Sequence, residues 1–355
     1  MKIGRLLLIG FEGTVLPEDF KPLIKKYGIG GFVLFERNLK TPEQILALNK
    51  ELHQIDADDG FTPIIAVDQE GGRVQRLKPP FSHLPSARKV GESYKKHKNI
   101  SDIYEYGSFI AQELAIAGFN MDLAPVLDLS EKKDGVIGDR AFSDVPLIVE
   151  EIGVSMIAGI QDHGIIACAK HFPGSTDTTV DPHKDLPSVN IKSDALVHNI
   201  TPFIHAIKND VGSVMVSHTL LKGIDTVPAS MSGRIINAML KMEANFKGIV
   251  LTDDVKMGAI SKSYSVSQAV IDSLGANADM VMISNTNPDE IESVLYAVRR
   301  AIDTGVIKKE QAESSLMRID IIKNEIGIKN QIVQSVPDIM KTLNDDKRKS
   351  ILKRF

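Results

Sequence analysis

The sequence predicts a single (β/α)8 barrel of the α/β class, and three observations lead to this fold. Short runs rich in Val, Ile, Leu and Met recur almost without charge, as in parallel strands that are covered on both faces. Segments with apolar residues at helical spacing lie between these runs. No G-x-G-x-x-G motif follows the first run, which disfavours a doubly wound sheet. The predicted strands are Leu6–Phe11, Gly31–Phe35, Ile64–Asp68, Leu123–Leu127, Ile165–Ala169, Ser213–Ser217, Ile249–Thr252 and Met280–Ser284.

The clearest helix begins at "TPEQILALNKELHQI", residues 41–55. Thr41 suits the N-cap, Pro42 the first helical position and Glu43 the first turn. Further helices are predicted at residues 101–119, 144–164 and 265–278, and residues beyond about 286 are expected to close the barrel. No linker divides the chain, so we expect a catalytic barrel domain at 1–330 and a C-terminal helical extension at 331–355.

Composition restricts the partners. The 355 residues are 43% hydrophobic and 25% charged, with a net charge of -4 and no basic stripe, so a nucleic-acid partner is not expected. The basic tail "DDKRKSILKRF" is expected to be a solvated helix end. No run approaches the ~20 apolar residues of a membrane span. The apolar start is short and interrupted by Gly4 and Arg5, which favours a first strand over a signal peptide and predicts a cytoplasmic location.

Metal and cofactor motifs are weak or missing. The only cysteine is Cys168, so neither an internal disulfide nor a thiolate cluster can form. Asp181 and His183 are two apart in "DPH", but no H-E-x-x-H accompanies them. No G-x-x-x-x-G-K-[ST] occurs either. We therefore predict no metal and no cofactor; we also expect a monomer.

Ionisable residues stand at the ends of five predicted strands, where a barrel of this kind carries its chemistry. Each has a structural alternative: a carboxylate can cap a helix or pair with an arginine, and His171 can be a core histidine. His218 is assigned a structural role. Convergence of the group on one face of the barrel nevertheless favours a site. The residues are Asp68, Asp128, Lys170 with His171, His218, and Asp253 with Asp254.

Sugar cleavage needs a carboxylate on one side of the ring and a proton donor on the other. Asp253, at a rigid strand end, suits a nucleophile that must stay ionised. His183 suits a group that donates a proton and then accepts one, because histidine titrates near neutrality. Asp181 can fix its tautomer and stabilise the imidazolium.

Six ordered segments, "DQEGGRVQRL", "APVLDL", "GDRAF", "KHFPG", "DPHKDLP" and "LTDDVKM", resemble family 3 glycoside hydrolases. The resemblance spans residues 5–290 and is strongest to single-domain β-N-acetylglucosaminidases (β-hexosaminidases) of the NagZ type. It implies that Asp253 is the nucleophile and that His183 is the acid/base, assisted by Asp181. It also implies retaining removal of terminal GlcNAc from peptidoglycan fragments in cell-wall recycling. The sugar contacts that it implies are Asp68, Arg76, Arg140, Lys170, His171 and Met257.

Two segments depart from the family pattern. The family reads "KHFPGHGDT", where this chain has Ser175-Thr176, and "DSH", where it has Asp181-Pro182-His183. Pro182 fixes its own φ and disfavours the α region at Asp181. Since neither change removes a catalytic group, we expect them to alter the rate and the loop geometry rather than the reaction.

Three alternatives stay open at this point. A β-N-acetylglucosaminide phosphorylase would suit a histidine acid/base, which adds no negative charge to repel phosphate. A β-glucosidase of the same family would prefer glucosides over GlcNAc substrates. A non-catalytic sugar-binding protein would bind without turnover, although Asp253, Asp181 and His183 argue against it.

Overall fold

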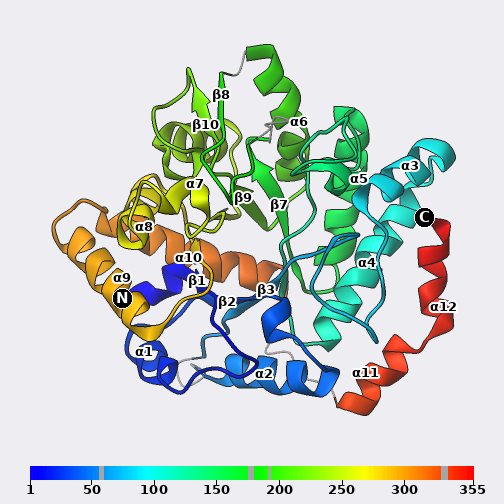
Figure 1. The fold of residues 1–355 in the computed structure, drawn as a ribbon, viewed down its shortest axis with the longest axis horizontal. Helices are drawn as coiled ribbons and strands as arrows, with labels where there is room; N and C mark the ends of the chain where they lie inside the picture. Colours follow the sequence, from blue (N-terminus) through cyan, green and yellow to red (C-terminus); the bar gives the residue numbers. More distant parts are fainter. Residues whose placement is uncertain (56–59, 175–179, 191–192, 329–334) are drawn as a thin grey trace.

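Eight parallel strands form the central sheet of the protein (Figure 1). In this computed structural model, which describes residues 1–55, 60–174, 180–190, 193–328 and 335–355, the sheet order is β11-β9-β7-β6-β3-β2-β1-β12. Leu251 forms a parallel bridge with Met280, and the Thr252 N–H donates to the Met280 carbonyl at 3.2 Å, which joins the two outermost strands. The predicted (β/α)8 barrel is therefore confirmed. The strands are β1 Leu7–Ile9, β2 Gly31–Leu34, β3 Ile64–Val67, β6 Met121–Asp122, β7 Ile166–Phe172, β9 Ser213–Val216, β11 Ile249–Thr252 and β12 Val281–Ile283.

The fourth strand differs from the prediction. The sequence predicts a strand at Leu123–Leu127, whereas β6 covers only Met121–Asp122. Pro125 lies in the predicted stretch and has no N–H to give to the ladder, so the regular pairing ends before it. The segment still follows β7, because the Leu127 N–H donates to the Lys170 carbonyl at 2.7 Å.

Helices connect the strands and form the outer layer. Thr41 and Ser265 act as N-caps, accepting hydrogen bonds from Gln44 N–H and Gln268 N–H. The four helices predicted from the sequence correspond to α2, α4, α5 and α8. Among the helices that the structure describes, none has the length and apolar character that a bilayer crossing needs. The connecting elements are α1 Phe20–Tyr27, α2 Pro42–Gln54, α3 Ala87–His97, α4 Ile100–Ile116, α5 Pro146–Gln161, α6 Ser193–Lys208, the π-helix η6 Arg234–Glu243, α7 Gly258–Ser261, α8 Val266–Gly275, α9 Pro288–Asp303 and α10 Lys309–Glu325.

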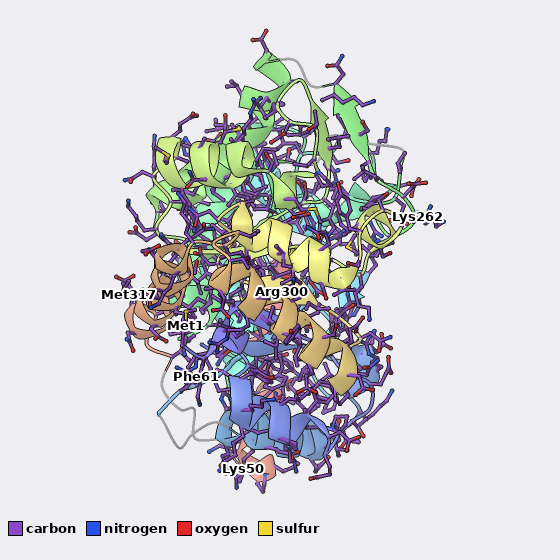
Figure 2. All side chains as sticks on the ribbon, turned by 90° about the vertical axis from the view of Figure 1, so that its left-hand side faces the viewer. Met1, Lys50, Phe61, Lys262, Arg300 and Met317 are labelled. Carbon is purple, nitrogen blue, oxygen red and sulfur yellow. The ribbon has the colours of Figure 1, made fainter. Side chains whose placement is uncertain are left out.

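The barrel interior is apolar toward the start of the strands. Side chains such as Leu8, Val33 and Leu251 form one buried cluster, to which α10 contributes Ile319 and Ile322. Helix α10 also contacts η1 (Ile3–Leu6), which leads into β1, so it covers the amino-terminal end of the barrel. Figure 2 shows α8 and α9 side by side on the outside. The opposite, carboxyl-terminal end is left for polar side chains.

The C-terminal residues pack against the barrel. Helices α11 (Val336–Leu343) and α12 (Asp346–Lys349) run beside α2 and α4 in Figure 1. The Phe355 ring lies 5.1 Å from that of Tyr106, and Arg348 pairs with Glu113 at 3.1 Å. The tail is therefore only partly solvated: Lys353 is exposed, as expected, whereas Ile351 is buried and Arg348 and Arg354 pair with carboxylates of α4. The boundary predicted at residue 330 lies outside the described residues and stays a prediction.

Candidate active site

A cavity of about 640 Å³ opens at the carboxyl-terminal end of the barrel strands. All of the predicted site residues line it, and they arrive from four separate strand ends and the loop after β7. The sequence predicts that these residues lie together, and the structure places them in one cavity. The predicted residues are Asp68, Arg76, Arg140, Lys170, His171, Asp181, His183, Asp253 and Met257.

A tight hairpin after β3 presents two of the charged groups. Strands β4 (Gln69–Gly71) and β5 (Val74–Gln75) pair antiparallel across a turn at Gly72 and Arg73. Gly71 has φ +94°, and a Cβ there would lie 2.3 Å from the Pro85 carbonyl oxygen, so both conformation and space require glycine. The buried Gln69 amide oxygen accepts the Arg76 N–H at 3.1 Å. These contacts fix the hairpin and thereby Glu70 and Arg76.

Lys170 is the centre of a buried ionic cluster. Its Nζ lies 2.8 Å from Asp68 Oδ1 and 2.6 Å from Glu70 Oε1, and its side chain is 2% exposed. Arg76 pairs with Asp68 at 3.0 Å, and Arg140 binds both oxygens of Glu70 at 2.8 Å. Glu70 is not among the site residues predicted from the sequence. The signal that could have identified it is its position in "DQEGGRVQRL", two residues after Asp68.

The charges of this cluster decide the protonation of its carboxylates. Burial acts against ionisation of Asp68, but Lys170 and Arg76 outweigh it and hold the Asp68 pKa below its usual value. Burial also acts against ionisation of Glu70, but the charges of Arg140 and Lys170 outweigh it and lower the Glu70 pKa to about 2. Asp68 and Glu70 are therefore ionised at neutral pH, and with their cations they offer charged donors and acceptors to a polyhydroxylated ligand.

His171 is oriented by a carboxylate beneath it. Its Nδ1 lies 2.7 Å from Asp128 Oδ2, and the same oxygen accepts the His171 backbone N–H at 3.2 Å. The Asp128 side chain has no exposed surface. An ionised acceptor at Nδ1 fixes the proton there and leaves Nε2 as the other ring nitrogen. Asp128 was recognised as a polar strand end, but its partner could not be read from the sequence.

The two aspartates after β11 have different surroundings. The Asp254 carboxylate accepts hydrogen bonds from the Lys256 N–H at 3.0 Å and the Ser284 N–H at 2.9 Å, and also from the Ser284 hydroxyl. It therefore shapes the loop. Asp253 Oδ1 accepts only the adjacent Asp254 N–H, at 2.8 Å, among the hydrogen bonds of the described residues. Asp253 is consequently the carboxylate available to a ligand.

Asp253 is held in its ionised form. Burial works against ionisation, but the neighbouring His218 and His171 rings outweigh it, followed by the Asp254 N–H and Lys170. The Asp253 pKa is lower than usual as a result. A low pKa suits a group that must carry a negative charge throughout the working pH range.

His218 supports this loop, in keeping with its predicted structural role. Its Nδ1 lies 2.8 Å from the Ser230 hydroxyl, and its Nε2 lies 2.9 Å from the Asp254 carbonyl oxygen. The carbonyl must accept, so Nε2 carries a proton. Both ring nitrogens are thus engaged with the protein.

The loop after β7 carries a histidine–aspartate pair. His183 Nδ1 lies 2.9 Å from Asp181 Oδ1, which also accepts the His183 N–H at 3.0 Å. The side chains are 69% and 35% exposed. Burial opposes the Asp181 charge, but the hydrogen bonds to His183 and the nearby charges together outweigh it and lower the Asp181 pKa. With Nδ1 bonded, Nε2 is the nitrogen left for a ligand. Ser175 and Thr176 lie outside the described residues.

Apolar side chains complete the cavity. Phe35, Met215, Met257 and Met282 line it, and the Arg76 guanidinium lies 5.7 Å from the centre of the Phe35 ring. Within the part of the chain that the structure describes, no three His, Cys, Asp or Glu side chains are grouped so as to hold a metal ion. The cavity therefore combines apolar surface with a few charged groups, as ligand sites do.

Known proteins share this sequence and fold. The family model "Glycosyl hydrolase family 3 N terminal domain" matches residues 1–322. A β-hexosaminidase of Nitrosomonas eutropha is 32% identical over 317 residues, covering 87% of this chain and 90% of its own. Another β-hexosaminidase, of Alkalilimnicola ehrlichii, is 34% identical over 81% of this chain and 83% of its own.

Solved structures agree with these matches. A glycoside hydrolase family 3 β-N-acetylglucosaminidase from Paenibacillus superposes with a TM-score of 0.91 at 32% identity, covering 99% of this chain and 67% of that one. NagZ from Neisseria gonorrhoeae, at 24% identity, shares the fold with a TM-score of 0.79 over 98% of this chain and 96% of its own. The chain thus belongs to glycoside hydrolase family 3 and is a β-hexosaminidase-like glycoside hydrolase.

Proposed function

We propose that the protein is a retaining exo-β-N-acetylglucosaminidase that removes terminal, non-reducing GlcNAc through a covalent glycosyl-Asp253 intermediate. The observation that carries this proposal is the presence, in one cavity, of an ionised carboxylate on a strand end and a histidine–aspartate pair on a loop. Asp253 acts as the nucleophile, His183 as the acid/base, and Asp181 orients and stabilises the His183 ring.

The first step forms the glycosyl-enzyme. Asp253 attacks the anomeric carbon while His183, protonated on both nitrogens, gives its Nε2 proton to the glycosidic oxygen, and the bond to the aglycone breaks. In the second step neutral His183 takes a proton from water, the water oxygen attacks the anomeric carbon, and the ester to Asp253 breaks. Two inversions give net retention. Asp181 stabilises the imidazolium at the start and end of the cycle.

The charged cluster binds the sugar hydroxyls in this proposal. Lys170 and His171 offer donors, and Asp68 offers acceptor oxygens that Lys170 already holds in place. Arg76 and Arg140 add donors from the hairpin side and from the loop after β6, and Met257 adds an apolar contact for the ring. Because their partners fix these groups before the sugar arrives, little ordering is left to the binding event.

The biological substrate is proposed to be a peptidoglycan-derived GlcNAc fragment, handled in the cytoplasm during cell-wall recycling by a monomeric enzyme without a cofactor. The relatives described above, a β-hexosaminidase and a β-N-acetylglucosaminidase, support GlcNAc as the sugar. The apolar start of the chain pairs as β1 inside the barrel, which supports a role for it in the fold rather than in targeting.

Five measurements test the proposal. The enzyme should hydrolyse 4-nitrophenyl GlcNAc in preference to the glucoside, and NMR should show the β-anomer as the first product. A fluorosugar inactivator should label Asp253, and Asp253→Ala should lose turnover. Labelling of another residue, an inverted first product or a preference for glucose would refute the corresponding part. Phosphate should not accelerate release; formation of GlcNAc-1-phosphate would establish the phosphorylase instead.

A further inference from the structure

We infer that Gly258 is a positioning residue, which fixes the His183 loop against the nucleophile strand because it has no side chain; this inference rests on the proposed role of His183. The loop docks on the first turn of α7 through main-chain atoms. The Ala259 N–H donates to the Pro182 carbonyl at 2.9 Å, and the Gly258 N–H donates to the His183 carbonyl at 3.3 Å. The carbonyls on both sides of the Pro182–His183 junction are thus held.

The space at Gly258 is closed by backbone. A Cβ there would lie 2.6 Å from the His183 carbonyl oxygen and 2.9 Å from the carbonyl carbon and oxygen of Lys184. Real Cβ contacts are essentially never shorter than 3.0 Å, and no flexible side chain can move aside here. Gly258 is not among the glycines with positive φ, so alanine fits its conformation. Glycine is required by the docked loop alone.

The same short stretch carries the nucleophile. Asp253 lies five residues before Gly258, and between them the Met257 N–H donates to the Asp254 carbonyl at 3.0 Å. The Asp254 side chain is itself tied to Ser284 beyond β12. A rigid connection therefore runs from the strand that holds Asp253 to the carbonyls beside the imidazole. Precise placement of both groups across one glycosidic bond depends on such a connection.

A second contact at the edge of the dock is weaker. Lys262, labelled at the edge of the molecule in Figure 2, pairs with Asp185 at 3.0 Å. Their side chains are 57% and 65% exposed, so water and salt screen the pair. The Lys184 and Asp185 N–H groups donate to the Asp181 carbonyl at 2.8 and 3.0 Å, which makes this part of the loop a compact turn. The Gly258 contact therefore governs its position.

The test compares Gly258→Ala with Gly233→Ala. Gly233 is the N-cap of η6, with φ −63°. A Cβ at this position would have no atom within 4 Å. For a phenyl GlcNAc substrate, whose leaving group needs a proton, we expect kcat/KM to fall about 10- to 100-fold in Gly258→Ala, part of the usual contribution of acid catalysis. For 2,4-dinitrophenyl GlcNAc, which leaves without protonation, kcat/KM should stay within about 3-fold of the wild type. Gly233→Ala and Lys262→Met should change neither value by more than about 3-fold.

The variant His183→Ala separates the positioning role of Gly258 from the proposed acid/base role of His183. His183→Ala should lose kcat/KM on phenyl GlcNAc but not on 2,4-dinitrophenyl GlcNAc. If it does so, while Gly258→Ala lowers kcat/KM equally on both substrates or on neither, the inference about Gly258 is wrong and the proposed acid/base stands. If His183→Ala shows no such dependence on the leaving group, the proposed function itself fails.

Hydrogen exchange gives a readout that needs no variant. Ala259 is in the first turn of α7, where N–H groups have no partner inside the helix, so its slow exchange would report the docked loop. We expect slow exchange in the wild type and faster exchange in Gly258→Ala. Fast exchange in the wild type would overturn the inference even if the variant did not fold.

Discussion

His171 Nδ1 and Asp128 Oδ2 lie 2.7 Å apart at the base of the cavity, and no part of the Asp128 side chain reaches solvent. This hydrogen bond fixes the tautomer of the His171 ring. Because the same oxygen also accepts the His171 backbone N–H, the orientation of the ring is fixed as well. A donor at Nδ1 with a buried anionic acceptor is a strong, directional hydrogen bond. Because Asp128 has no exposed surface, it acts on a ligand through the groups that it holds, and His171 is one of them.

Asp128→Asn tests this relationship. The amide keeps the shape but loses the charge, so we expect kcat/KM on 4-nitrophenyl GlcNAc to fall about 10- to 100-fold, as for a lost hydrogen bond of about 1.5–3 kcal/mol to a charged group. Asp162→Asn, at a surface contact with Tyr104, is the control and should leave kcat/KM unchanged. Wild-type activity in Asp128→Asn would show that the pair is dispensable.

Lys170 should be essential for the fold as well as for sugar binding. In Lys170→Met the carboxylates of Asp68 and Glu70 lose their shared cation, so we expect the free energy of unfolding to fall by about 3–5 kcal/mol. Urea denaturation measures this. Lys26→Met removes the exposed pair with Glu292 at 3.3 Å and should cost less than about 1 kcal/mol. Equal midpoints for the two variants would contradict the role of the buried cluster.

Glu70 should make stability depend on pH in the acid range. Its pKa falls from 4.5 to about 2 on folding, so its contribution is complete above the unfolded value and is lost as the pH falls through the folded one. We expect the difference in unfolding free energy between the wild type and Glu70→Gln to shrink as the pH is lowered from about 5 to about 2. A difference that is constant over this range would mean that the Glu70 pKa is not lowered on folding.

The acid limb of the pH profile of kcat/KM should report Asp253. Asp253 must be ionised to act as the nucleophile, and its lowered pKa places this limb below the ordinary aspartate value of 3.8. Initial rates on 4-nitrophenyl GlcNAc, measured across the acid range, locate the limb. An acid limb at or above 3.8 would contradict the assignment of Asp253.

The strand ends were predictable because parallel strands are buried on both faces and bring their polar termini to one edge. This is why Asp68, His171 and Asp253 could be placed in one site from sequence alone. The pairing of His171 with Asp128 could not be predicted, because it is a contact between side chains on neighbouring strands that lie far apart in the sequence. The docking of the His183 loop on Gly258 was equally invisible, because it uses main-chain atoms that leave no residue-type signature.

Pro182 should be replaceable by serine, the residue in the family pattern, with little loss. Its contribution to the dock is a carbonyl oxygen, which any residue supplies to the Ala259 N–H. Serine frees the undocked loop, which costs about 0.4–1 kcal/mol of preorganisation, or about a 2- to 5-fold lower population of the docked form. We therefore expect kcat/KM on phenyl GlcNAc to fall no more than about 5-fold in Pro182→Ser. A loss as large as that of His183→Ala would show that the proline ring itself, rather than its carbonyl, sets the position of the imidazole.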